Sequence, residues 1–279
     1  MTVGVANIFR LTIPLLALSL CAQDQSSTPP PPATDQSAST QPTPQAPSDT
    51  TERDVSINPK HFARNFFSDQ KMIWTFPFKL ATGHQVLPTL AVVAGTAALV
   101  AGPDPYEARY FRKHESTYHG FSNVLAEHRT TAATLLTPAA FYVTGLITKD
   151  AYTQKTGLLA IEAWVDVDII GEVTRNIALR RRPLDIPPDG NYRNTWFKTA
   201  ESPLHATGSF PSGHTAWGFA VATVIARRYP KHKWVPFVAY GLASLDALSR
   251  LTSNNHFLSD AVFGSVLGYV TGRYVVLRQ

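Results

Sequence analysis

Helix-length apolar segments follow one another from residue 86 to the end of the chain. None of them alternates apolar and polar residues as a half-buried strand does, and each is long enough to form a helix. Short polar or proline-containing joints separate most of the segments. The sequence therefore predicts an all-α fold, a helical bundle of about six core helices. The segments are residues 86–102, 130–147, 157–182, 215–226, 235–248 and 261–277.

The first 22 residues are typical of a secretory signal peptide. A short apolar run follows Arg10 and ends at Cys21 and Ala22, where the chain turns polar. Such a run is too short for a membrane span, so we expect cleavage after Ala22 and export of the rest. The alternative is a lipoprotein anchored through Cys21, although the preceding leucine is larger than that motif prefers. The predicted location is the periplasm or a membrane-associated site in the cell envelope.

Residues 23–53 consist mainly of Ser, Thr, Pro, Gln and Ala, and they hold seven of the 21 prolines. They offer almost nothing apolar to bury, which predicts a disordered, extended linker. The whole chain has 279 residues and a single cysteine, so neither an internal disulfide nor a cysteine-based zinc site can form. Its formal net charge of +5 is too small to indicate a nucleic-acid-binding protein.

The segment 54–85 is predicted to be an N-terminal arm. Its Phe and Trp side chains, with Lys71 and Lys79 among them, would suit a helix that lies on a membrane surface. The alternative is an arm that packs onto the body of the protein. The remaining residues, 86–279, form the predicted helical domain.

The apolar segments give opposing indications about a membrane. Segments 86–102 and 130–147 are slightly shorter than the roughly 20 residues that a span needs. Segment 157–182 also holds Glu and Asp residues, which are unfavourable in lipid. Against this, the average of 44% hydrophobic residues includes the polar linker, so the body is more apolar than that value. We therefore expect an exported body that is largely periplasmic or membrane-associated, rather than a protein with six spans.

Small residues recur at a spacing of four in the last predicted helix, at Gly264, Gly268 and Gly272. This spacing places them on one face, where two helix backbones can approach closely. The helix that begins near residue 215 has a second stripe of this kind. It consists of Gly218, Ala222 and Ala226.

Arg175 and the pair Arg182–Pro183 form the first of three motifs that carry chemistry. Their separation is nearly two helical turns, so both guanidinium groups are expected on one face of a helix. Pro183 would then end that helix. Two arginines on one face suit an oxyanion such as phosphate, which accepts paired N–H donors. The alternative is a solvated basic helix end, to which Arg180 and Arg181 would contribute.

The second motif, Pro211-Ser212-Gly213-His214, opens the next predicted helix. Ser212 can cap this helix, and the free backbone N–H groups of a helix N-terminus bind anions. His214 in the first turn would stand beside such an anion and could give a proton to a departing oxygen. The alternative is an ordinary serine cap with an incidental histidine.

The third motif combines Ser249-Arg250 with His256 and Asp260 near the start of the last helix. His256 and Asp260 are four residues apart, so their side chains can face each other. A carboxylate on one imidazole nitrogen fixes the tautomer and leaves the other nitrogen nucleophilic. Arg250 would close on the oxyanion. The alternative is a His–Asp pair that only caps the helix locally.

Together, these motifs resemble the type-2 phosphatidic acid phosphatase superfamily, which includes lipid phosphate phosphatases, bacterial non-specific acid phosphatases and vanadium haloperoxidases. The resemblance covers about residues 155–279. The family usually has Lys at the position of Arg175. Arginine is bulkier than lysine. Because it keeps the positive charge, we expect activity to survive.

The resemblance implies a metal-independent phosphatase that works through a phosphohistidine. His256 would attack phosphorus, Asp260 would orient His256, and His214 would protonate the leaving oxygen and then activate water. No cofactor is implied, and vanadate would act as an inhibitor. The phosphate oxygens would be held by Arg175, Arg182, Ser212, Gly213 and Arg250.

The expected substrate is a phosphate monoester or diphosphate, either a lipid phosphate such as phosphatidic acid or isoprenyl diphosphate, or a small phosphoester. The loop 184–210 is placed to cover the site and select the substrate. One alternative is a vanadium-dependent haloperoxidase, in which vanadate would be the cofactor. Another is a non-catalytic envelope protein that only binds anions. The sequence indicates no nucleic-acid partner and leaves the oligomeric state open.

Overall fold

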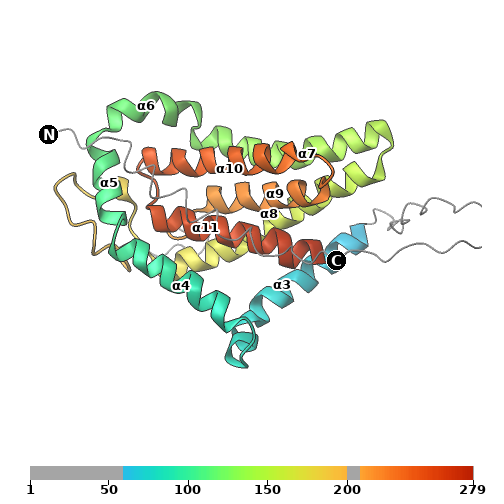
Figure 1. The fold of residues 1–279 in the computed structure, drawn as a ribbon, viewed down its shortest axis with the longest axis horizontal. Coiled ribbons are helices and arrows are strands. Elements are labelled where there is room, and N and C mark those ends of the chain that lie inside the picture. Colours follow the sequence, from blue (N-terminus) through green and yellow to red (C-terminus); the bar gives the residue numbers. More distant parts are fainter. Residues whose placement is uncertain (1–58, 200–207, 279) are drawn as a thin grey trace, which may run out of the picture. The chain divides into compact units, whose positions relative to one another are not determined.

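The computed structural model describes residues 59–199 and 208–278, apart from the side chains of residues 59–61. The predicted signal peptide, 1–22, and the predicted linker, 23–53, lie outside this part of the chain. All regular elements within the described residues are helical, which confirms the predicted all-α class. Figure 1 shows their arrangement.

Each of the six predicted apolar segments forms a helix, and the structure adds α3, α5 and α6. The sequence analysis missed α5 and α6 because both are short and polar and lack an apolar run of helical length. Short turns also occur: 3₁₀ turns at η1 (Pro183–Asp185) and η3 (Val276–Arg278) and a π-helical turn at η2 (Thr271–Val275). The α-helices are α3 (Pro59–Ala81), α4 (Val86–Ala101), α5 (Asp104–Lys113), α6 (Glu115–Val124), α7 (Glu127–Thr148), α8 (Ala151–Ala178), α9 (Gly213–Arg228), α10 (Trp234–Thr252) and α11 (Leu258–Val270).

Helix α9 is the central helix of the bundle and packs against α8, α10 and α11. In Figure 1 it lies between α10 and α11. Its core-facing residues are small, and Ala216 and Ala220 are only 1% and 0% exposed. Val224 is buried in the same core cluster as Val167 of α8. Because the second motif lies at the N-terminus of α9, the best-packed part of the fold supports that motif.

The glycine stripe of α11 provides the predicted close approach between helices. A Cβ atom at Gly264 would lie 2.6 Å from the carbonyl oxygen of Ser212, so only glycine fits there. The surface of α9 that faces this stripe is Ser212, Ala216 and Ala220. The second stripe faces another helix, since its Gly218 lies against Ala243 of α10. The approach of Gly264 to Ser212 holds the start of α9 directly against α11.

Helix α8 ends at Ala178, so the prediction that it continues to residue 182 is wrong. Leu179 adopts a left-handed conformation with φ 44°, and its N–H closes the helix by donating to the Arg175 carbonyl at 3.0 Å. The following backbone bonds to a loop instead, since the Arg181 N–H donates to Thr195. Arg182 is extended, as expected before proline. Arg175 and Arg182 therefore do not share one helix face.

Helix α3 packs onto the body with one face, as the second interpretation of the N-terminal arm proposed. The Gln70 amide donates to Asp166 of α8 at 2.8 Å, and Arg278 pairs with Asp69 at 2.9 Å. The other face leaves large aromatic side chains exposed, with Phe67 at 69% and Phe78 at 74%. One face of α3 thus packs on the body, and the other face exposes apolar side chains.

Two of the four acidic residues of α8, Glu162 and Asp166, are buried in the protein, whereas the side chains of Asp168 and Glu172 are 29% and 39% exposed. Asp166 and Glu162 are 0% and 2% exposed, and Asp168 accepts a hydrogen bond from the Trp217 indole at 3.1 Å. Ionisable residues of membrane-facing bundles also face inward and are paired there. The buried acids therefore do not count against an apolar environment around the bundle, although their presence in the sequence suggested that they would.

Candidate active site

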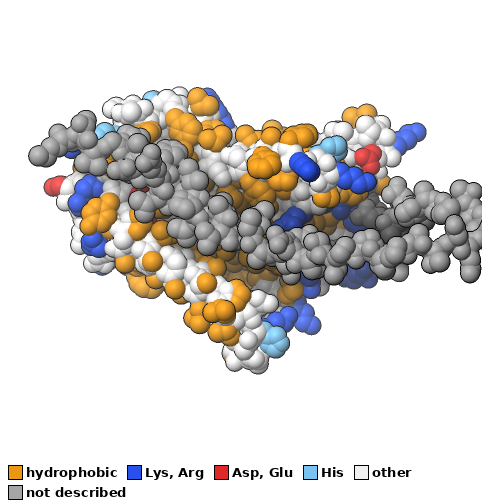
Figure 2. Space-filling view, in the orientation of Figure 1, with side chains coloured by type: hydrophobic (Ala, Val, Ile, Leu, Met, Phe, Trp, Pro, Cys, Tyr) orange, Lys and Arg blue, Asp and Glu red, His pale blue; other side chains and the backbone are white. Residues whose placement is uncertain are grey.

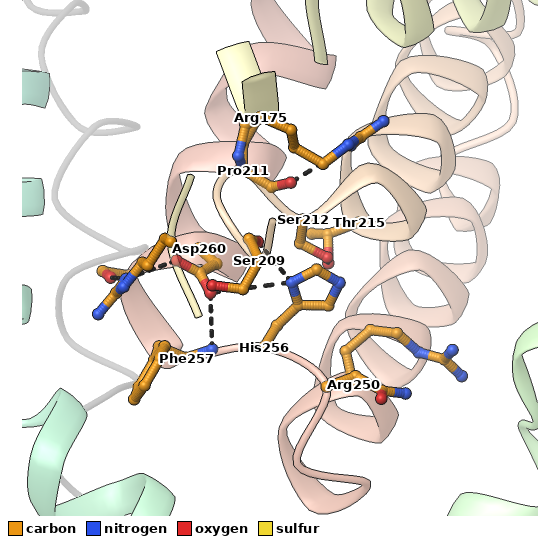
Figure 3. A network of polar contacts seen from close by, with 12 residues as sticks. Arg175, Ser209, Pro211, Ser212, Thr215, Arg250, His256, Phe257 and Asp260 are labelled. Carbon is orange, nitrogen blue, oxygen red and sulfur yellow. Dashed lines mark hydrogen bonds and ion pairs between the residues drawn. The ribbon is translucent and has the colours of Figure 1, made fainter. Parts of the chain in front are cut away.

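His256 lies in the loop between α10 and α11 and is buried, with 4% of its surface exposed. Its Nδ1 atom is 2.7 Å from the carbonyl oxygen of Ser209, and Figure 3 shows this contact. A carbonyl oxygen only accepts hydrogen bonds, so Nδ1 must carry the proton. The other nitrogen, Nε2, is therefore left with its lone pair. Burial lowers the pKa of His256, which favours this neutral form.

Asp260 lies close to His256 but is not its hydrogen-bond acceptor. Its Oδ2 atom is 3.8 Å from His256 Nδ1, an ion-pair distance rather than a hydrogen bond. The same oxygen accepts the backbone N–H of Phe257 at 2.8 Å, and Oδ1 accepts from Arg180 at 2.5 Å. The sequence analysis expected the carboxylate to fix the tautomer, and the Ser209 carbonyl occupies that place. A backbone carbonyl carries no signal of residue type, so the sequence could not identify it.

His214 lies in the first turn of α9 and is 7% exposed. Its Nε2 atom is 2.8 Å from the hydroxyl oxygen of Thr131, which α7 supplies. Burial, together with the nearby charges of Arg250 and Arg182, lowers the pKa of His214 to about 3. His214 is therefore neutral in the free protein. Thr131 was not predicted, because nothing in its own sequence context links it to the motif.

Arg250 extends along the end of α10 and is 1% exposed. Its Nη2 atom donates to the carbonyl oxygen of Leu125, and Nε lies 3.5 Å from Asp246. The Nη1 atom is buried and has no hydrogen-bond partner among the described residues. Buried donors are rarely left unpaired, so Nη1 is available for an anion.

Arg182 is a second cation, besides Arg250, near the two histidines. It is half-buried, and its positive charge lowers the pKa of His256 and of His214. The charge of Arg182 also lowers the pKa of Arg250. The structure thus brings Arg182, Arg250 and both histidines close enough to affect one another electrostatically.

Arg175 reaches the second motif but is already paired with acids. It is 4% exposed, so it does not form the solvated basic helix end that was the alternative. Its Nη1 atom is 3.4 Å from the Pro211 carbonyl, and a Cβ atom at Gly213 would lie 2.7 Å from it. Its Nη2 atom pairs with Glu172 and lies 3.9 Å from Asp168. Its charge is therefore partly neutralised beside the motif.

Ser212 is the residue before the first turn of α9, as predicted, but its side chain does not cap the helix. The hydroxyl instead bonds to Thr215 at 2.9 Å, and the Ser212 N–H donates to the Asp260 carbonyl at 3.1 Å. The second and third motifs are therefore joined through backbone. The N–H groups of the first turn of α9, including that of Gly213, remain candidates for an anion.

The segment that carries the three motifs is also similar to known proteins. Residues 156–279 match the family model described as the PAP2 superfamily. A segment of 68 residues is 38% identical to the lipid A 1-phosphatase of Porphyromonas gingivalis and covers 24% of this chain. The match spans only 15% of that relative's length.

A solved structure is also similar over a longer stretch. It is the crystal structure of the first transmembrane PAP2 type phosphatidylglycerolphosphate phosphatase from Bacillus subtilis. The identity is 21% with a TM-score of 0.40, over 78% of this chain and 93% of that one. Residues 156–279, which carry the three motifs, are thus similar to the PAP2 superfamily.

Proposed function

We propose that this protein is a phosphatase that hydrolyses a phosphate ester through a covalent histidine intermediate. The observation that carries the proposal is His256, which is buried with its Nδ1 proton held by Ser209 at 2.7 Å and its Nε2 lone pair free. Cations surround it, and Arg250 retains an unpartnered donor. A neutral, oriented imidazole beside fixed positive charge suits attack on a phosphate.

The proposed reaction has two steps. Nε2 of His256 attacks phosphorus, the phosphorus–oxygen ester bond breaks, and the leaving oxygen takes a proton from His214. Water then attacks phosphorus and gives its proton to His214, while the phosphorus–nitrogen bond breaks and its electron pair returns to Nε2 of His256, which releases phosphate. Arg182, Arg250 and the first N–H groups of α9 would stabilise the negative charge on the phosphate oxygens.

His214 must gain its proton together with the substrate. In the free protein its pKa is about 3, so it is uncharged at neutral pH. A phosphate dianion beside the ring would favour the imidazolium form and raise that pKa. His214 would then take up a proton when the substrate binds and hold that proton beside the leaving oxygen. His256 and His214 keep the roles expected from the sequence, whereas the Ser209 carbonyl takes the orienting role expected of Asp260.

We propose that the substrate is a lipid phosphate and that the protein contacts a membrane. Helix α4 consists almost entirely of apolar residues, and none of its 16 residues is buried. Figure 2 shows hydrophobic side chains over the area of α4 and along α10. Among the described residues, Glu115–Thr148 forms a helical stretch that is long and apolar enough to cross a membrane, with only 17% of its most apolar part buried. Large exposed apolar areas indicate a lipid or protein partner.

The curated relative supports a lipid substrate through its name, lipid A 1-phosphatase. A second candidate function, non-catalytic anion binding in the cell envelope, is favoured by one observation. Arg175 is paired with Glu172 and lies near Asp168, so one of the expected phosphate ligands is partly neutralised.

A phosphate-release assay on purified protein distinguishes these functions. The panel compares phosphatidic acid and isoprenyl diphosphate with a water-soluble monoester, with and without detergent and with a metal chelator. We expect release from a lipid phosphate that survives the chelator and is lost in His256→Gln. Binding of phosphate without turnover of any ester would favour the non-catalytic function. Halide oxidation after vanadate loading, without phosphate release, would instead indicate a haloperoxidase.

A further inference from the structure

A buried ionic network lies behind His256, on the side away from the free Nε2 atom. Arg180 is its centre and is 1% exposed, while Asp104 and Asp260 are 0% exposed. The Arg180 guanidinium donates to Asp260 at 2.5 Å and to Asp104 at 2.8 Å. It also donates to the hydroxyl of Ser259 at 2.7 Å. The alternative interpretation of the first motif placed Arg180 in a solvated basic helix end, which its burial contradicts.

Arg180 contacts both groups that face Nδ1 of His256. Its side chain holds the Asp260 carboxylate, which is 3.8 Å from Nδ1. Its backbone carbonyl accepts the N–H of Ser209 at 2.7 Å, and the Ser209 carbonyl in turn accepts from Nδ1 at 2.7 Å. One residue therefore fixes both acceptors around the imidazole.

The guanidinium of Arg180 has little freedom to move. It lies over the ring of Phe257 at 4.0 Å and near the ring of Trp196 at 4.7 Å. Its Nε atom donates to the hydroxyl of Thr195 at 3.1 Å. A planar fork fixed in this way can satisfy two carboxylates at once, which a lysine ammonium cannot do with the same geometry.

Asp104 comes from α5, outside the segment that matches the family. It accepts the backbone N–H of Ser259 at 2.9 Å and its hydroxyl at 2.5 Å, in the first turn of α11. Asp104 therefore ties α5 to the helix that carries Asp260 and shares the charge of Arg180 with it. Glu107, one turn further along α5, is so deeply buried that its pKa is raised well above the ordinary value.

We propose that Arg180, anchored by Asp104, is a positioning residue that sets the orientation and basicity of His256. The proposal rests on the proposed function, since it assigns a role in the reaction of His256. Arg180 draws the Asp260 carboxylate away from Nδ1 and leaves the Ser209 carbonyl as the hydrogen-bond acceptor. Asp104 limits how much of the Arg180 charge acts on Asp260.

Two substitutions shift this balance in opposite directions. In R180K the carboxylate of Asp260 is held less firmly and can turn toward Nδ1, which favours the protonated imidazole and moves the acid limb of the kcat/KM profile to higher pH. In D104N the whole charge of Arg180 falls on Asp260, and the acid limb moves to lower pH. The other charged and titratable groups around His256 stay the same, namely the cations Arg182 and Arg250 and the neutral His214.

The experiment measures kcat, KM and the pH profile of wild type, R180K and D104N on the lipid phosphate that wild type hydrolyses. We expect kcat to fall by about 10- to 100-fold in R180K with little change in KM, as for other outer partners of a reactive side chain. The matched control is R228K, because Arg228, the last residue of α9, is also buried, at 9% exposure, and bonds to Thr156 of α8 at the opposite end of α9 from the site. R228K should keep the kcat and pH profile of wild type.

Histidine NMR provides a readout that does not depend on turnover. The His256 ring is assigned by comparison with H256Q and titrated in each variant, and opposite shifts of its pKa in R180K and D104N support the proposal. Unchanged titration and unchanged kcat in either folded variant would overturn it. An inactive wild type would contradict the proposed function instead, while the NMR shifts would still test the role of Arg180. If R180K unfolds, D104N decides alone, because asparagine keeps the shape of Asp104.

Discussion

Ser209 and His256 are 47 residues apart in the chain, yet the Ser209 carbonyl oxygen lies 2.7 Å from Nδ1 of His256. This contact determines which imidazole nitrogen is free, because a carbonyl can only accept the proton that Nδ1 holds. It also connects the loop before the second motif to the loop before α11. The reactive nitrogen is thus set by backbone geometry from a different part of the chain.

Gly264→Ala should disturb this connection. The new Cβ would lie 2.6 Å from the Ser212 carbonyl oxygen, so α11 and the start of α9 must separate. We expect the free energy of unfolding to fall by roughly 1–3 kcal/mol, the usual effect of overpacking. Denaturant unfolding measures it, with Gly241→Ala as the control because open space surrounds that position. Equal stability of the two variants would show that the close approach is not tight.

Thr131→Val tests the support of His214. The hydroxyl lies 2.8 Å from Nε2 of His214, and valine keeps its shape without the hydrogen bond. We expect kcat to fall by about 3- to 10-fold, which corresponds to the net value of one hydrogen bond. Thr137→Val, one to two turns further along α7, removes only a bond to the Ala133 carbonyl and serves as control. Identical kcat values for the two variants would contradict a role for Thr131.

Glu172→Gln should release Arg175 for the substrate. The variant removes the carboxylate that pairs with Nη2, while Nη1 stays against the second motif. We expect KM for the phosphate ester to fall by roughly 3- to 10-fold, since hydrogen bonds to charged groups contribute about 1.5–3 kcal/mol before solvent screening. Glu115→Gln, which breaks only the surface pair with Arg112, is the control. A KM equal to that of wild type would mean that Arg175 does not bind the phosphate.

Acid should destabilise the protein partly through His214. Its pKa is about 3 when folded and near 6.5 when unfolded, so the unfolded state binds the proton first as the pH falls. The stability from a neutral His214 is complete above about pH 6.5 and is lost progressively down to about pH 3. His214→Gln should therefore show a smaller drop in Tm between these values than the exposed-site control His232→Gln. The same drop in both variants would contradict the buried, neutral state of His214.

Much of the fold was predictable because its helices contain long apolar runs. The motif residues were also predictable as a set, and the structure places His214, His256, Arg182 and Arg250 near one another. The end of α8 was not predictable, because a left-handed Leu179 stops the helix before Pro183 can do so. A leucine carries no sequence signal for that conformation.

The groups that hold the site in place escaped the sequence analysis for a different reason. Ser209 acts through a backbone carbonyl, and Thr131 through a common hydroxyl on another helix. Asp104 belongs to the short polar helix α5, which has no apolar pattern to reveal it. Arg180 looked like part of a solvated basic run, and only its tertiary partners explain why it is buried.

The central claim is that His256 becomes covalently phosphorylated during turnover. Its most direct test is to mix purified protein with radiolabelled phosphatidic acid, stop the reaction in alkali and identify the labelled peptide. The account predicts an alkali-stable label on the peptide that contains His256 in wild type, and neither label nor phosphate release in His256→Gln. Phosphate release by His256→Gln at the wild-type rate, with no labelled histidine in either protein, would contradict it.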